Sequence, residues 1–255
     1  MQAMIFAAGK GTRLKPLTDV IPKALVPVGD KPLLQHVMDR LEETGVRNVV
    51  VNVHHHAGQV RNFLELSGRA YGFSISVSDE TDRLLETGGG IKKARPLFGD
   101  TTEPVLIHNV DILSNVSLRE FAMEAKGCDA ALLVSSRKTQ RYLLFGQDMR
   151  LVGWTNVATG EVRSPFPDIK AMDGDAEAVA RRFRGRMFAF SGIHLFSPAL
   201  FPLMDGWGDR FPIMDFYLHH CADVCIKGVA RSDLRLLDVG KLDTLAAAEE
   251  FLQSI

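Results

Sequence analysis

Residues 3–23, AMIFAAGKGTRLKPLTDVIPK, place a short apolar run directly before a basic loop that contains two glycines. The run from Ala3 to Ala8 is continuous rather than alternating, which is typical of a strand that is covered on both faces. Glycines after such a strand let backbone N–H groups approach an anion closely. The loop carries four cations and one acid, namely Lys10, Arg13, Lys15, Lys23 and Asp19. This stretch therefore predicts a buried strand followed by a phosphate-binding loop, with a solvated basic turn as the alternative.

The spacing of this loop excludes two common phosphate-binding motifs. Leu14 stands where GxGxxG requires its third glycine. The Walker motif is also absent, because no GK[ST] sequence follows a glycine at the spacing that this motif requires. A third kind of nucleotide loop is therefore expected.

Apolar runs alternate with helical patterns through the first half of the chain, which predicts an α/β fold with a doubly wound, mostly parallel central sheet. The helix after Asp30 is expected to use this residue as its cap and to have Pro32 in its first turn. The other expected strands are 49–53, 73–77, 105–108 and 130–134, and the other expected helices are 56–66, 89–97 and 118–125.

The second half is less regular. Residues 142–145 and 151–154 suggest a hairpin, and 163–185 lack clear periodicity, which indicates a lid or an insertion. Further strands are expected at 187–196, 224–229 and 235–239, and further helices at 212–222 and 242–252. We expect one domain over 1–255, with two halves at about 1–135 and about 136–255.

Composition limits the class of protein. The chain has 255 residues, 46% of them hydrophobic, and a formal net charge of −1, so it lacks the global basic field of most nucleic-acid binders. Its three cysteines are too few for a disulfide framework, and Cys221 and Cys225 are expected on one helix face as thiols. No signal peptide or membrane-spanning run is recognised. We expect a cytoplasmic monomer or small homo-oligomer without nucleic-acid or membrane partners.

The ordered run from Gly9 through Pro16-Leu17-Thr18 to Pro22-Lys23-Ala24-Leu25-Val26-Pro27-Val28 resembles the signature of the nucleotide-sugar pyrophosphorylases. The resemblance implies that the loop wraps the phosphates of an NTP, that Arg13 assists the departing pyrophosphate, and that Lys23 contacts the reacting phosphates. Arg13 and Lys23 are thus the expected catalytic residues. The resemblance also implies nucleotide contacts from Ala7, Ala8, Gly9, Gly11 and Thr12.

Leu85-Glu86-Thr87-Gly88-Gly89-Gly90 resembles the glycine-rich turn beside the nucleoside, particularly in N-acetylmuramate-1-phosphate uridylyltransferases and heptose- or mannose-1-phosphate guanylyltransferases. This implies nucleotide contacts from Thr87 and Gly88. Glu80 and Glu86 flank the same turn, where a carboxylate can accept N–H bonds from guanine or uracil, and ordinary surface charge is the alternative. UTP and GTP therefore both remain candidate substrates.

By the same resemblance, Asp111 and Asp238 are the expected Mg²⁺ ligands, although Val110 stands where the family has glycine. Two carboxylates at strand ends suit this hard, oxygen-preferring cation. The resemblance also implies that the sugar 1-phosphate contacts Ser191 and Gly192, with Asn109 and Asn156 as additional candidates. It thus implies a nucleotide-binding half at about 1–135 and a sugar-binding half at about 136–255. The lysine of the sugar pocket of larger relatives has no clear counterpart.

The implied reaction is transfer of a nucleoside monophosphate from UTP or GTP to the 1-phosphate of N-acetylmuramate, mannose or heptose, with release of pyrophosphate. The alternatives are cytidylyl transfer to a non-sugar phosphate such as phosphocholine, and a catalytically silent nucleotide-sugar-binding subunit. The tract His54-His55-His56 is expected as a turn near the nucleotide, because consecutive strand residues point to opposite faces and rarely share a metal. Residues 181–186 are expected as a solvated or lid segment rather than an RNA contact.

Overall fold

The predicted apolar runs form neighbouring strands in the computed structural model, which describes residues 1–99 and 102–255. Gln2–Phe6 (β1) lies between Asn48–Val53 (β4) and Val105–Asn109 (β6), and Ser74–Asp79 (β5) lies outside β4, all parallel. Ala3 and Ile5 pack on one face of β1 while Met4 packs on the other. Because both faces are covered, the strand needs apolar residues at every position.

The sheet continues beyond β6 with Met187–Phe196 (β12), which runs antiparallel to β6. Ala130–Ser135 (β8) pairs with β12, and Ile226–Ala230 (β13) pairs with β8 in parallel. The predicted hairpin is present as the antiparallel pair Arg141–Phe145 (β9) and Leu151–Asn156 (β10), and Val162–Arg163 (β11) adds a third strand. The α/β fold class with its mostly parallel central sheet is confirmed.

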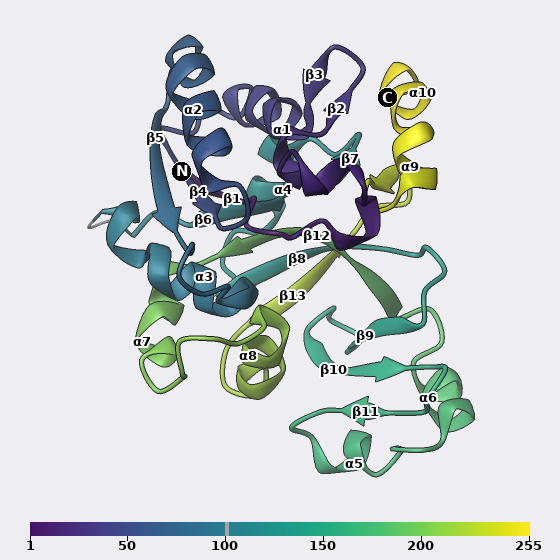
Figure 1. The fold of residues 1–255 in the computed structure, drawn as a ribbon. Helices are drawn as coiled ribbons and strands as arrows, with labels where there is room; N and C mark the ends of the chain where they lie inside the picture. The colour runs from purple at the N-terminus through teal and green to yellow at the C-terminus, as the bar shows by residue number, and fades with distance from the viewer. Residues whose placement is uncertain (100–101) are drawn as a thin grey trace.

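Helices cover the two faces of the sheet, as a doubly wound fold requires (Figure 1). One layer contains Leu33–Glu42 (α1), Ala57–Ser67 (α2) and Leu118–Glu124 (α4). The other contains Glu86–Ala94 (α3), Phe201–Met204 (α7) and Ile213–His220 (α8). Short 3-10 helices lie at Thr12–Leu14, Leu17–Asp19, Lys23–Leu25, Gly68–Ala70, Arg95–Phe98 and Pro198–Leu200.

The stretch 163–185, predicted as a lid or an insertion, shares a small core with β9 and β11. It contains Pro167–Lys170 (α5) and Ala176–Arg182 (α6), which lie beside the β9–β10–β11 strands (Figure 1). The core of the insertion is apolar and consists of Leu144, Val162, Ile169, Val179 and Phe183. These contacts explain why a segment without clear periodicity is nevertheless ordered.

Three local predictions were wrong. Asp30 does not cap α1, because it lies in the two-residue turn between Pro27–Val28 (β2) and Lys31–Pro32 (β3), and the helix starts after Pro32. The closing helix is divided into Leu242–Ala246 (α9) and Ala248–Gln253 (α10). Cys221 is the cap of α8, whereas Cys225 lies beyond the helix and immediately before β13, so the two do not share a helix face.

Among the residues that the structure describes, no helix has the length and apolar character needed to cross a membrane.

Candidate active site

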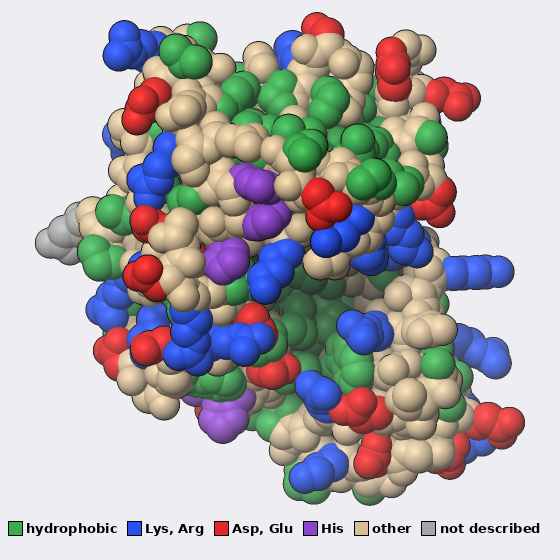
Figure 2. Space-filling view, viewed as in Figure 1, with side chains coloured by type: hydrophobic (Ala, Val, Ile, Leu, Met, Phe, Trp, Pro, Cys, Tyr) green, Lys and Arg blue, Asp and Glu red, His purple; other side chains and the backbone are tan. Residues whose placement is uncertain are grey.

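A cavity of about 240 Å³ opens where β1, β4 and β6 end, which is the edge of a parallel sheet where ligands bind. It is lined by Lys23, Asn109 and Asp111, together with four of the predicted nucleotide-binding residues, namely Ala8, Gly9, Glu80 and Thr87. In Figure 2 the molecule is hollowed between its main body and the β9–β10–β11 strands, with Lys and Arg side chains on the rims. The lining residues of the cavity are Phe6, Ala8, Gly9, Lys23, Asn52, Glu80, Leu84, Glu86, Thr87, Asn109, Val110 and Asp111.

The loop after β1 has a fixed backbone path. Gly11 has φ +63°, and a Cβ atom there would lie 2.6 Å from Cγ2 of Thr18, so the position requires glycine. The Thr18 hydroxyl donates to the Gly11 carbonyl oxygen at 2.8 Å. His55 Nε2 lies 3.1 Å from the Thr18 carbonyl oxygen, so the predicted histidine turn is present and supports this loop. Thr12, which is exposed, begins the 3-10 turn beside Gly11.

Asn52, near the end of β4, is a site residue that the sequence analysis missed. Its Oδ1 accepts from the N–H groups of Ala7 at 2.7 Å and Ala8 at 3.2 Å. Its Nδ2 donates to Glu80 Oε1 at 2.7 Å, and Glu80 Oε2 accepts from the Leu85 N–H at 3.0 Å. This buried network joins the phosphate loop to the glycine-rich turn. A polar residue inside the apolar run 49–53 is the signal that points to it.

Two predicted nucleotide contacts, Glu80 and Ala7, take part in this network. Both Glu80 oxygens already accept hydrogen bonds within the protein, and Glu80 is 0% exposed, so it positions Asn52 and Leu85. Ala7 likewise uses its N–H on Asn52. Ala8 lines the cavity itself.

The glycine-rich turn packs closely against a distant loop. The Gly88 N–H donates to the Phe211 carbonyl oxygen at 2.8 Å, and a Cβ atom on Gly88 would lie 2.3 Å from the Phe211 ring. Gly88 therefore serves close packing, and its N–H is already used. Thr87 and Glu86 line the cavity, and Glu86 forms an ion pair with Arg210 at 2.7 Å.

The two predicted metal carboxylates come together through a short antiparallel pair. Ile112–Ser114 (β7) pairs with Leu236–Asp238 (β14), which places Asp238 opposite Ile112, next to Asp111. The Val239 N–H donates to the Asp111 carbonyl oxygen at 2.8 Å. The Val110 N–H donates to the Phe6 carbonyl oxygen at 3.2 Å, so valine is accommodated where the family has glycine.

The charges around these carboxylates suit a metal bound with phosphates. Lys23 Nζ forms an ion pair with Asp111 Oδ2, and both side chains are largely buried. Asp238 Oδ1 is buried without a hydrogen-bond partner, and burial, followed by the negative charge of Asp111, raises the pKa of Asp238. An unpaired carboxylate oxygen beside a second carboxylate fits Mg²⁺, which takes one or two carboxylates plus phosphate oxygens and water.

Arg13 lies close to Gly240 and acts as a nearby positive charge on Asp238. A Cβ atom on Gly240 would lie 2.6 Å from Arg13 Nη2 and 2.7 Å from Asp238 Oδ1. The structure therefore brings Arg13, Lys23, Asp111 and Asp238 together around the end of β1.

Three of the predicted sugar contacts lie where β12 meets the end of β6, and the fourth lies in the turn after β10. Gly192 has φ +76°, and a Cβ atom there would lie 2.8 Å from Asn109 Nδ2, so β12 approaches the cavity-lining Asn109 closely. Ser191 is 1% exposed, and its hydroxyl has no partner within the described chain. Asn156 instead supports the turn after β10, where its Oδ1 accepts from the Ala158 N–H at 3.0 Å.

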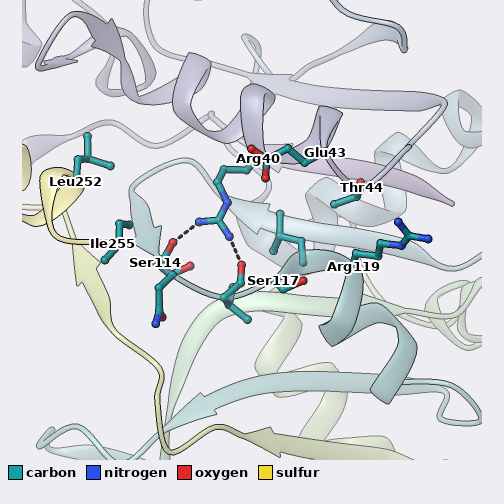
Figure 3. A pocket seen from close by; sticks show the side chains of 11 residues that line it. Arg40, Glu43, Thr44, Ser114, Ser117, Arg119, Leu252 and Ile255 are labelled. Atoms are coloured by element: carbon teal, nitrogen blue, oxygen red, sulfur yellow. Dashed lines mark hydrogen bonds between the residues drawn. The ribbon is translucent and has the colours of Figure 1, made fainter.

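A second cavity, of about 570 Å³, lies beside the C-terminal end of α1 and away from these charges (Figure 3). The Arg40 guanidinium, on α1, donates to the carbonyl oxygens of Ser114 and Val116. Burial lowers the pKa of Arg40. Because β7 follows Asp111 directly, Arg40 helps to position the strand next to this predicted metal ligand.

Comparisons with known proteins show which family this chain resembles. The model of the family described as nucleotidyl transferase matches residues 2–146. An N-acetylmuramate alpha-1-phosphate uridylyltransferase from Caulobacter vibrioides is 33% identical over 97% of this chain and 95% of its own length. A mannose-1-phosphate guanyltransferase from Yarrowia lipolytica is 26% identical over 80% of this chain and 52% of its own length. A UDP-glucose pyrophosphorylase solved with UDP-glucose superposes with a TM-score of 0.73 at 16% identity, covering 99% and 98% of the two chains.

Proposed function

This chain belongs to the nucleotidyl transferase family, and from that premise we propose that it transfers a nucleoside monophosphate from UTP or GTP to a sugar 1-phosphate and releases pyrophosphate. The observation that carries the proposal is the meeting of Asp111 and Asp238 beside Lys23 and Arg13, at the end of the strand that begins the phosphate loop. Such a cluster suits the binding of several phosphate groups.

The residues of this chain supply position and charge, which are the main requirements of phosphoryl-type transfer. The loop after β1 would hold the triphosphate through its free N–H groups, while Asn52 fixes its first turn. Arg13 offers a planar fork to phosphate oxygens, and Lys23 provides a compact charge beside the reacting phosphate. The phosphate of the acceptor is already an anion near neutral pH, so no general base is needed.

Asp111 and Asp238 would hold the Mg²⁺ ion. When bound, the ion would offset the repulsion between the phosphates and polarise the one that is attacked. The orphaned Asp238 Oδ1 is the structural reason for assigning this role. Lys23 would then hold Asp111 in place through their ion pair.

For the substrates, we place N-acetylmuramate 1-phosphate with UTP first, because the relative from Caulobacter vibrioides matches over nearly the whole chain. Mannose 1-phosphate with GTP comes second, after the relative from Yarrowia lipolytica. Glu86 and Thr87, which line the cavity on the β4 side, are the side chains we assign to the base.

The test is pyrophosphate release from each of the four common NTPs with N-acetylmuramate, mannose and heptose 1-phosphates, with and without Mg²⁺. The expected result is turnover that is fastest with one pair of substrates, slower with the related sugar 1-phosphates, and stops when Mg²⁺ is chelated. Absence of turnover across the whole matrix would refute the proposal. Turnover with CTP and phosphocholine alone would favour a cytidylyltransferase, and NTP binding without any turnover would favour a silent subunit.

A further inference from the structure

Lys23, Arg13 and Arg137 are cations that lie near the proposed metal ligand Asp238, and of these only Lys23 forms an ion pair in the described part of the chain. Lys23 pairs with Asp111, and Arg13 lies close to Gly240. The third cation is Arg137, in the link between β8 and β9. Arg137 forms no ion pair with any carboxylate in the described part of the chain, so its charge remains available to a ligand.

The position of Arg137 relative to the sheet is well defined. Ser135 ends β8 opposite Ala189 of β12, and Arg137 Nη2 then donates to the Phe190 carbonyl oxygen at 3.3 Å. Phe190 directly precedes Ser191 and Gly192, where β12 approaches Asn109 in the cavity. The positive charge of Arg137 also acts to lower the pKa of Asp238, as a nearby cation does.

The order of strands separates Arg137 from the base end of the cavity. The sheet runs β12, β6, β1, β4, β5, and the candidate base contacts follow β5 and begin α3 on the β4 side. Arg137 is held by β12, on the other side of β1 and β6. The proposed metal site, at the end of β6, lies between them. A ligand group at Arg137 would therefore belong to the second substrate rather than to the nucleoside.

We propose that Arg137 binds an oxyanion of the acceptor sugar phosphate and makes this chain selective for it. The inference rests on the proposed function. The acceptor sugar phosphate is a dianion that must approach a triphosphate and two carboxylates. A cation on the β12 side of the cavity offsets the repulsion between these negative charges. The guanidinium presents a planar fork that suits phosphate and carboxylate alike. Arg137 would thus take the place of the sugar-pocket lysine that this sequence lacks.

Steady-state kinetics of Arg137→Ala test the proposal, with the neighbouring exposed cation removed in Lys138→Ala as the matched control. The KM for the sugar 1-phosphate should rise roughly 10- to 100-fold in Arg137→Ala, as expected when a charge-assisted hydrogen bond is lost, with the KM for the NTP changed less than about twofold. Arg137→Lys should recover part of the affinity because it restores the charge without the fork. Lys138→Ala should match the wild type.

The acceptors distinguish the two possible oxyanions. An equal effect on mannose 1-phosphate and on N-acetylmuramate 1-phosphate, which also has a carboxylate, assigns Arg137 to the phosphate. An effect on N-acetylmuramate 1-phosphate alone assigns it to the carboxylate. The inference is overturned if Arg137→Ala leaves the KM for the acceptors unchanged, or if it changes only the KM for the NTP. In that case, turnover by the wild-type protein still supports the proposed function. An inactive wild-type protein overturns both.

Discussion

Replacing Gly240 with alanine would disturb the proposed metal site with one methyl group. The added Cβ would lie 2.6 Å from Arg13 Nη2 and 2.7 Å from Asp238 Oδ1, whereas ordinary contact begins near 3.4 Å. The guanidinium and the carboxylate must therefore retreat by about 0.8 Å and 0.7 Å. Both groups lie at the ends of side chains that can rotate. The backbone therefore need not move, and the fold is retained.

Displacement of this size matters more to catalysis than to stability. A shift of about 1 Å in a positioning group can cost about 100-fold in rate, so we expect Gly240→Ala to lower kcat by roughly 10- to 100-fold. We expect the free energy of unfolding to change by less than about 1 kcal/mol, because the strain is relieved by movement of side-chain ends.

The assay is pyrophosphate release with saturating substrates, with urea unfolding of the same preparations. Gly208→Ala is the matched control, because a Cβ atom there meets nothing within 4 Å. A kcat within about twofold of the wild type in Gly240→Ala would show that the positions of Arg13 and Asp238 do not limit the reaction, and the reasoning would be refuted. Equal losses in both glycine variants would have the same consequence.

Three further predictions follow from buried polar groups. Asn52→Ala should lower the free energy of unfolding by about 2–4 kcal/mol in urea titration, because it leaves Glu80 Oε1 and the Ala7 N–H without a partner. A loss no larger than that of Asn48→Ala would contradict this. The raised pKa of Asp238 means that the folded protein binds its proton more tightly than the unfolded chain, so the stability of the metal-free protein should increase as pH falls toward that pKa. Asp238→Asn should accordingly raise the thermal midpoint of the metal-free protein at pH 7 and weaken the pH dependence of its stability. The same substitution should reduce turnover at least about 100-fold. A lowered thermal midpoint would contradict this prediction. Arg40→Met should lower the free energy of unfolding by about 1–3 kcal/mol, since two carbonyl oxygens lose their donor. Arg119→Ala, at another residue that lines the second cavity, should leave the free energy of unfolding unchanged.

Much of the fold was predictable because its signals are local. Continuous apolar runs reveal strands that are covered on both faces, and these became β1, β4, β5, β6 and β8. The start of α1 was mispredicted because Asp30 suits both a cap and a turn, and only the β2–β3 pairing decided between them. The insertion at 163–185 was recognised only as irregular, since its five core residues come from separate elements.

The sequence by itself determined the phosphate loop, the two aspartates and the family they indicate, because these depend on residue types at fixed local spacing. Only the tertiary structure decided which side chains meet. The pairing of β7 with β14 brings Asp238 beside Asp111, and Gly88 proved to be a packing position against Phe211. Asn52 and Arg137 acquire their roles from strands that are neighbours in the sheet but distant in the chain. Such contacts are set by strand order and register, which are properties of the packed sheet rather than of any short stretch of sequence.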